Sequence, residues 1–312
     1  MKNRTNNEKY SDKRIVTTAC LVDMLDIFLN GIVAIFTGSV VMLAETLQGV
    51  SDLTVDGLTY IGMKRSKRMP TPKHPLGYGR ELYIWSLFSV LIMFFVLAGF
   101  SFYFGFQRLL SPEPIAYIGL AYIILIISII TNGYSLSLAF KRLLNNQPFW
   151  RIKKLFKQST FLETKITFTS DLMGVLSAVF GLIALLLFQY SGYPIFDALG
   201  AITIACLMLF FSMFLLKNVK DFIIGVSAPL EVQKRIKQAA LEIQGVEEIL
   251  DLKTLVIGSN RLLVNLEIHV QSGLVTEEIE KMIDRIKERV RQRVPAVHHI
   301  QIELETPDRE LQ

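Results

Sequence analysis

Apolar residues fill the first two thirds of the chain in long blocks, whereas apolar and polar positions alternate in the last third. A helix of about 20 residues crosses the hydrocarbon core of a bilayer. On that length the sequence predicts six membrane-spanning helices, near residues 15–37, 39–63, 83–107, 115–139, 164–188 and 194–216. Short uncharged turns join the first pair and the last pair. The sequence therefore predicts an α-helical membrane domain.

The pattern beyond residue 216 is typical of a small water-soluble domain. It predicts an amphipathic helix, two strands, a second amphipathic helix and a short strand, over residues 230–244, 246–256, 262–270, 276–294 and 299–304. The order α-β-β-α-β is typical of a compact α+β, ferredoxin-like fold with its helices on one face of a sheet.

Lysine and arginine gather in residues 1–14, 64–80 and 141–157, and Arg108 is the basic residue expected on the opposite side. Because basic connections stay in the cytoplasm, we expect both termini there. The predicted domains are a cytoplasmic N-terminal tail at 1–14, a transmembrane domain at 15–216 and a cytoplasmic C-terminal domain at 217–312. The tail has mixed charge, so we expect no removable signal peptide.

Composition agrees with a membrane protein that carries a soluble portion. The chain is 51% hydrophobic and only 20% charged, with a net charge of +5. Basic residues that flank membrane helices contact anionic lipid head groups, so the charge calls for membrane lipid and not for nucleic acid. Cys20 and Cys206 stand alone in apolar runs and form no disulfide framework or cysteine metal site. No common catalytic motif occurs, so we expect no enzyme.

The second predicted helix carries a polar stripe through its apolar surroundings. Its members recur every three or four residues, which places them on one helix face: Glu45, Gln48, Asp52, Asp56 and Thr59. A carboxylate inside a bilayer costs several kcal/mol, so such a residue is a functional hypothesis by default. A whole stripe favours a path for a polar substrate over a single structural hydrogen bond.

Two further helices carry similar stripes. Asp23, Asp26 and Asn30 lie on the first, and Glu163, Thr167 and Asp171 lie on the fifth. Asp52 and Asp171 both fall near mid-span, and two carboxylates that meet there repel unless a cation or proton lies between them. This is the physical argument for a cation site. Asp23 and Asp26 leave two interpretations open: a proton relay, or hydrogen bonds that hold helices together.

These residues resemble a known family, the cation diffusion facilitators. The resemblance depends on Thr37-Gly38-Ser39, on Ala44-Glu45 and Asp52, on the run from His74 to Glu81, and on Ser170-Asp171. It covers almost the whole chain. It implies a homodimer that exports a divalent metal cation in exchange for protons, by alternating access to a site between the second and fifth helices.

Transferred position by position, the family's metal site falls on Gln48, Asp52, Thr167 and Asp171. Oxygen ligands suit harder cations, whereas imidazole and thiolate favour zinc and copper. The ligand types therefore favour manganese, ferrous iron or magnesium over zinc as the transported ion. The remaining stripe residues are assigned to the path or to proton relay: Asp23, Asp26, Glu45, Asp56 and Glu163.

The resemblance also suggests sites outside the membrane. A second family site in the loop after the second helix is expected to be absent, because only His74 remains there, with Thr71 and Tyr78 at the other positions. The candidates for a metal site in the C-terminal domain are Glu267, His269, Glu280 and Glu303. The candidate ion pair that ties this domain to the membrane helices is Arg80 with Asp221.

Three functional hypotheses follow from the sequence. The first is proton-coupled export of a divalent cation, in a bacterial inner membrane. The second is a family member that transports nothing and acts as a metal-sensing or scaffold partner. The third is an exchanger of a monovalent cation for protons, since an oxygen cage can also hold sodium.

Overall fold

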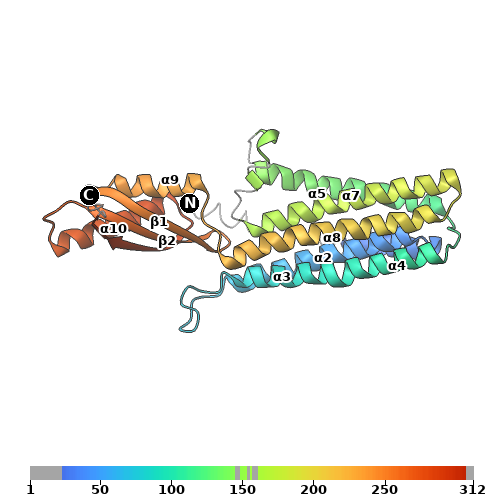
Figure 1. The fold of residues 1–312 in the computed structure, drawn as a ribbon, viewed down its shortest axis with the longest axis horizontal. Helices are drawn as coiled ribbons and strands as arrows, with labels where there is room; N and C mark the ends of the chain where they lie inside the picture. Colours follow the sequence, from blue (N-terminus) through green and yellow to red (C-terminus); the bar gives the residue numbers. More distant parts are fainter. Residues whose placement is uncertain (1–22, 145–147, 153–154, 157–160, 307–312) are drawn as a thin grey trace, which may run out of the picture. The chain divides into compact units, whose positions relative to one another are not determined.

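A computed structural model describes residues 23–144, 148–152, 155–156 and 161–306 (Figure 1). The predicted N-terminal tail at 1–14 lies outside these residues. The chain divides into two compact units. The membrane unit comprises Met1–Tyr60, Trp85–Ile152 and Glu163–Asn218, and the sheet unit comprises Ile61–Ile84, Lys153–Leu162 and Val219–Gln312.

Long helices that run side by side form the membrane unit (Figure 1). The described part of the first covers residues 23–37. The others are α2 Val40–Ser66, α3 Glu81–Ile92 with α4 Ala98–Leu110, α5 Ile118–Leu144, α7 Leu162–Ser191 and α8 Ile195–Ile224. A π-helical segment, Met93–Leu97, joins α3 to α4 without a break. The predicted helical membrane domain is confirmed, and several helices extend beyond the predicted bounds.

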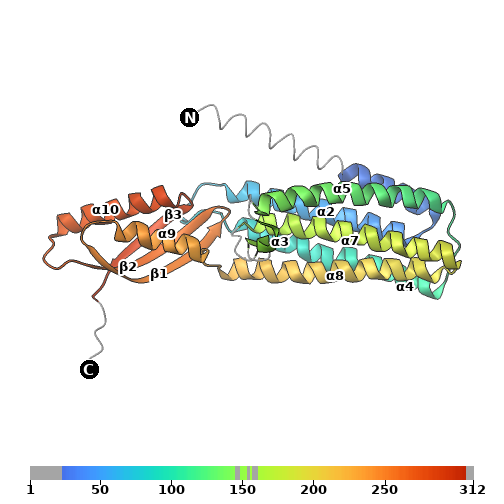
Figure 2. The same cartoon turned by 90° about the horizontal axis from the view of Figure 1, so that it is seen from above.

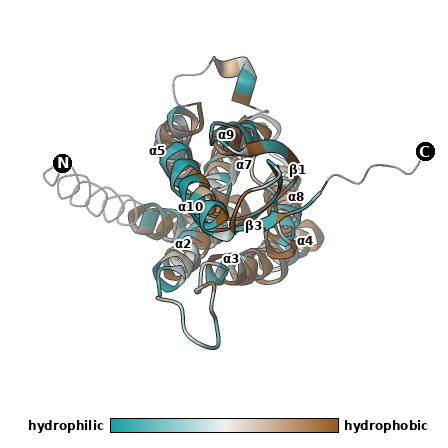
Figure 3. Cartoon of the chain, turned by 90° about the vertical axis from the view of Figure 1, so that its left-hand side faces the viewer, coloured by the Kyte–Doolittle hydropathy of each residue, from teal (hydrophilic) through white to brown (hydrophobic). Residues whose placement is uncertain are grey.

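Judged by length and composition, four of the described helices could cross a membrane: Glu81–Leu110, Ile118–Lys141, Leu162–Ser191 and Ile195–Ile224. Large apolar side chains on them remain exposed, such as Phe95, Ile130 and Phe210. Figure 3 shows how the membrane helices differ from those of the sheet unit: α4 is mostly hydrophobic and α10 is mostly hydrophilic. Exposed apolar surface of this extent is expected where lipid and not water surrounds the helices.

Small residues let the membrane helices approach one another closely. A Cβ atom added at Gly200 on α8 would lie 2.5 Å from Ala184 Cβ and 2.6 Å from Val41 Cγ2. A Cβ atom at Gly105 on α4 would lie 2.9 Å from Ile202 Cγ1. Close packing of this kind contributes to helix association in membranes, where burial of apolar surface contributes little.

The sheet unit confirms the predicted order of elements (Figures 1 and 2). Its helices and strands are α9 Leu230–Leu241, β1 Val246–Gly258, β2 Arg261–Val270, α10 Thr276–Arg293 and β3 Val297–Leu304. The strand order is β1-β2-β3, with β1 antiparallel and β3 parallel to β2. A crossover through α10 is what a parallel β2–β3 pair requires.

One face of this sheet is the core of the unit. Alternate β2 residues from Leu262 to Ile268 are buried, and Met282, Ile286 and Val290 line the buried side of α10. The apolar face that alternation predicts for β2 and the apolar face that helical periodicity predicts for α10 therefore both lie in this core.

The loop before α3 also belongs to the sheet unit. Thr71 pairs with His74 as an isolated bridge, and the His74 and Tyr78 rings lie 4.6 Å apart. The loop then approaches the β1–β2 turn so closely that a Cβ atom on Gly79 would lie 2.2 Å from the Ile257 carbonyl oxygen. Only glycine permits this approach of two backbones.

Candidate metal site

The polar stripe of α2 meets α7 at Asp52. The Ser170 hydroxyl donates a hydrogen bond to Asp52 Oδ1 at 2.7 Å, and the Gln48 amide donates to Asp52 Oδ2. The i, i+4 spacing of Gln48 and Asp52 makes them neighbours on one helix face. We call Gln48, Asp52, Ser170 and Asp171 the mid-helix site.

The charges that act on Asp52 are of one sign. In the described part of the chain, the charged groups acting on Asp52 are the carboxyls of Asp56, Asp171 and Asp23. Hydroxyl and amide donors orient the Asp52 carboxylate but do not neutralise it. A cation placed among these oxygens would relieve both the desolvation of Asp52 and the repulsion from its neighbours.

The ligand set of this site is oxygen-rich. Gln48 turns its amide N–H toward Asp52 here, and rotation of the amide would present its carbonyl oxygen to a metal instead. Thr167 is half-buried, one turn before Asp171 on α7. Ser170 is an oxygen donor that the sequence pattern did not place in the site. Its position directly before Asp171 on the same helix turn is the signal that could have found it.

The described residues contain no group of three or more His, Cys, Asp or Glu side chains close enough to hold a metal ion. Two carboxyls, an amide and hydroxyls are what the mid-helix site offers. That donor set agrees with oxygen coordination by a hard cation and lacks imidazole and thiolate ligands.

The other stripe residues divide into different environments. Asp56 is exposed, whereas Asp23 and Glu163 are half-buried. Asp26 accepts a hydrogen bond of 2.7 Å from Ser128 on α5, which in turn accepts one of 3.3 Å from Asn30. This geometry favours, for Asp26, a hydrogen-bonded role between helices.

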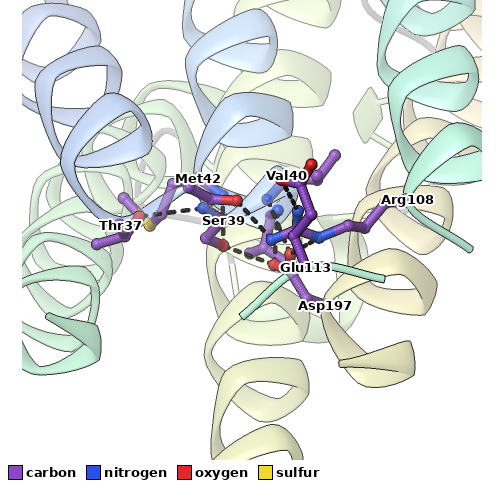
Figure 4. Close-up of polar contacts among 9 residues, drawn as sticks. Thr37, Ser39, Val40, Met42, Arg108, Glu113 and Asp197 are labelled. Atoms are coloured by element: carbon purple, nitrogen blue, oxygen red, sulfur yellow. Dashed lines mark hydrogen bonds and ion pairs between the residues drawn. The ribbon is translucent and has the colours of Figure 1, made fainter. Parts of the chain in front are cut away.

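A second buried polar group surrounds the turn between the first helix and α2 (Figure 4). Asp197 at the start of α8 is fully buried, and its Oδ2 accepts a hydrogen bond of 3.2 Å from Arg108 Nε on α4. Ser39 donates to Asp197 Oδ1 at 2.6 Å. Arg108 also reaches Glu113 at 2.9 Å and the Gly38 carbonyl at 2.6 Å. We call Ser39, Arg108, Glu113 and Asp197 the turn cluster.

The turn cluster fixes the beginning of α2. The amides of Val40 and Val41 donate to the two oxygens of Asp197 at 3.0 and 3.1 Å. A carboxylate at this position satisfies helix N–H groups that have no partner within the helix, and it interacts favourably with the helix dipole. Arg108 stood out in the sequence, whereas Asp197 was missed. A lone cation and a lone acidic residue at the ends of membrane helices each need a partner, which is the signal that could have paired them.

The candidates in the C-terminal domain do not form one cluster. Glu267 and Glu303 are register partners on β2 and β3, and His269 Nε2 lies 3.4 Å from Glu247 Oε2. Glu280, however, is exposed on α10, which packs against the opposite face of the sheet through Met282, Ile286 and Val290. The structure therefore separates Glu280 from the other three predicted ligands.

The predicted ion pair of the loop and α8 is also absent among the described residues. Arg80 and Asp221 are both exposed and share no ion pair. An ion pair instead joins Arg65 to Glu81, at 3.9 Å.

The fold is that of an integral membrane protein with carboxyls buried between its helices and a small α/β domain at its C-terminal end. The chain belongs to the cation efflux family, whose members are the cation diffusion facilitators. Residues 16–223 match the family of the cation efflux transmembrane domain. Residues 228–307 match the family of the cation efflux protein cytoplasmic domain.

Individual relatives share about a quarter of their aligned residues with this chain. The human "Proton-coupled zinc antiporter SLC30A9, mitochondrial" is 26% identical over 286 residues, covering 88% of this chain and 50% of the relative. "Metal tolerance protein C4" of Arabidopsis thaliana is 24% identical, covering 96% of this chain and 75% of the relative. The chain thus spans about half the length of the first of these. A solved nickel form of MamM CTD is 21% identical with a TM-score of 0.23, covering 24% of this chain and 95% of that one.

Proposed function

We propose that this protein moves a divalent cation out across its membrane in exchange for protons, with the mid-helix site and Thr167 as the binding site. The observation that carries the proposal is the Asp52 carboxylate. It accepts a hydrogen bond from Ser170 across the α2–α7 contact, and the charged groups that act on it in the described chain are three other carboxyls. The human relative's name describes a proton-coupled antiporter, which supports the same activity here.

The exchange follows from competition for one set of oxygens. A divalent cation binds when Asp52 and Asp171 are ionised, with Gln48, Ser170 and Thr167 supplying neutral oxygens. Cation binding replaces the Gln48 and Ser170 donors that orient Asp52 in this structure. On the opposite side of the membrane, protons compete for the carboxylates and release the cation. Asp56 and Glu163 attract cations toward the site from the adjacent ends of their helices.

The assembly and orientation are part of the same proposal. The match to the cytoplasmic domain family supports a homodimer with that domain in the cytoplasm. The basic segments at 64–80 and 141–157 support the same side for both termini. A bacterial inner membrane remains our proposal for the location, and the human relative's name gives a mitochondrial one.

The identity of the ion is proposed from the ligands. Oxygen donors without imidazole favour manganese, ferrous iron or magnesium. The relative's name specifies zinc, which makes zinc the ion against which the others must be compared.

The test uses the purified full-length protein in proteoliposomes. We expect uptake of divalent cation to be accompanied by proton movement in the opposite direction, and Asp52→Asn to abolish both. Glu113→Gln is the matched control, because it removes a carboxylate from an exposed side chain outside the site. Manganese, ferrous iron, magnesium, zinc and sodium are compared in parallel. Flux of sodium alone would favour the monovalent exchanger, and no flux with any ion would favour the non-transporting partner.

A further inference from the structure

Glu45 is a buried carboxyl that the exchange described above does not use. It lies on α2 in the same stripe as Gln48 and Asp52, and its side chain is only 3% exposed. Its Oε1 atom accepts no hydrogen bond from any residue that the structure describes. A carboxylate in such a position has lost its water and has no donor at one of its two oxygens, so ionisation is costly.

The elements packed against α2 at this level supply no positive charge to Glu45 among the described residues. The first helix packs closely, since a Cβ atom on its Gly31 would lie 3.5 Å from Thr46 Cγ2. The groups that face Glu45 are the Asp26 carboxyl of that helix and the Ser177 hydroxyl of α7. A neighbouring carboxyl makes ionisation of Glu45 harder still.

Asn30 adds a second buried acceptor on the first helix. It is 1% exposed, and its Oδ1 atom has no donor within the described residues. Its amide nitrogen donates to the Asp26 carbonyl at 2.9 Å and to Ser128 at 3.3 Å, and Ser128 donates to Asp26. The amide is thereby held in one orientation with its oxygen unpaired. Two unpaired acceptors on neighbouring helices call for a proton as the missing partner.

We propose that Glu45 binds one further exchanged proton, in a site of its own that lies beside the hydrogen-bonded group of Asp26, Asn30 and Ser128 and is distinct from the mid-helix metal site. The proposal rests on the proposed exchange of a divalent cation for protons. The proton binds a Glu45 carboxylate oxygen from water on one side and returns to water on the other.

The distance to the metal site explains the coupling. Asp52 follows Glu45 by seven residues on α2, a rise of about 10 Å along the helix. A divalent charge at that distance, in surroundings less polar than water, lowers the proton affinity of a carboxyl about tenfold or more. Metal binding at Asp52 therefore drives the proton from Glu45, and protonation of Glu45 weakens metal binding.

The first experiment compares Glu45→Gln with the wild type in proteoliposomes. Proton movement is read from a trapped pH-sensitive dye and metal uptake from a trapped manganese-sensitive dye. We expect the variant still to bind manganese but to move fewer protons per manganese ion than the wild type. The wild-type rate changes about tenfold per pH unit for each coupled proton, and the variant loses the part of that dependence that Glu45 contributes, while Asp52 and Asp171 keep theirs. Unchanged proton movement and an unchanged pH profile in Glu45→Gln would overturn the proposal.

A second measurement needs neither transport nor a variant. Infrared spectra of the full-length protein at neutral pH are recorded with unlabelled and with carboxyl-13C glutamate. A protonated glutamic acid gives a carbonyl band that the label shifts, and its absence would overturn the proposal. Glu45→Gln should remove the band, and the control Glu163→Gln should leave it. A wild-type protein that shows this band but transports no metal would refute the proposed exchange while keeping the proton on Glu45.

Discussion

The turn cluster and the mid-helix site each hold a carboxylate at α2, and they differ in how its charge is balanced. Asp197 accepts hydrogen bonds from Arg108, Ser39 and two backbone amides. Asp52 accepts them from Ser170 and Gln48 only, and its charged neighbours in the described chain are acidic. The first carboxylate is neutralised by the protein. For the second, we propose that the transported cation supplies the missing positive charge.

This difference separates a structural carboxylate from a binding one. A saturated buried ion pair is stabilised within the fold, and removing one partner leaves the other uncompensated. A carboxylate without a balancing positive charge weakens the fold and is stabilised only when a cationic ligand binds. The turn cluster therefore fixes the start of α2, and the proposed binding site lies about three turns further along the same helix.

The largest effect is expected at the turn cluster. Asp197→Asn leaves the Arg108 guanidinium buried beside a neutral amide, and we expect the free energy of unfolding to fall by about 3 kcal/mol. The measurement is denaturant titration of the full-length protein in detergent, followed by helical circular dichroism. Glu113→Gln is the matched control: its side chain is 73% exposed, so its loss should be about 1 kcal/mol or less. Equal losses in the two variants would contradict the anchoring role.

At the mid-helix site the expected effect falls on binding and not on folding. Asp52→Asn should weaken manganese binding about 100-fold, which is about 2.7 kcal/mol. Its stability should equal or exceed that of the wild type, because repulsion from Asp171 disappears. Titration calorimetry and the same denaturant titration measure the two quantities. Ser170→Ala keeps both carboxyls and should lose less affinity. A large loss of stability in Asp52→Asn would place this residue with the structural carboxylates.

A change in packing near the turn cluster should also lower stability. Gly200→Ala puts a methyl group 2.5 Å from Ala184 Cβ and 2.6 Å from Val41 Cγ2. Relief of these contacts requires α2, α7 and α8 to move apart, at a cost of about 1–3 kcal/mol. Thermal unfolding of the purified variant measures the loss, and wild-type stability would show that the contact is easily relaxed.

The other end of α2 offers the opposite case. A Cβ atom added at Gly57 would have no neighbouring atom within 4 Å, so alanine meets no obstacle there. Because alanine favours a helix over glycine, Gly57→Ala should raise stability by about 0.5–1 kcal/mol. The same thermal assay applies, and a loss of stability would show that this part of α2 packs as tightly as the turn.

The smallest effect is expected at an exposed ion pair of the sheet unit, which serves as the reference for both membrane sites. The hydrogen bond from Lys253, at 2.9 Å, lowers the pKa of Asp251 below its ordinary value of 3.8. A depressed pKa gives stability that is present above the unfolded pKa and is lost as pH falls through the folded one. We therefore expect Asp251→Asn to flatten the acid slope of stability below about pH 4. Urea unfolding of the full-length protein across that range measures it, and an unchanged slope would show that the pair contributes nothing.

Periodicity along single elements predicted much of this molecule. The stripe spacing placed Gln48 beside Asp52, and the pattern beyond residue 216 predicted all five elements of the sheet unit in their order. Contacts between distant segments were not predictable in the same way. Arg108 and Asp197 are 89 residues apart, and their pairing depends on how α4 and α8 are rotated about their axes. Hydrophobic periodicity identifies the buried face of a helix but not which neighbour that face meets.

The π-helical segment Met93–Leu97 controls that rotation for α4. A wide turn of this kind accommodates one residue more than the regular spiral does. Every side chain that follows is thereby turned by about 100° relative to the preceding α3. Deleting a single residue here would swing the Arg108 guanidinium toward lipid and leave Asp197 without its cation. The direction in which Arg108 leaves the axis of α4, and with it the fixed start of α2, thus depends on one extra residue about three turns earlier in the chain.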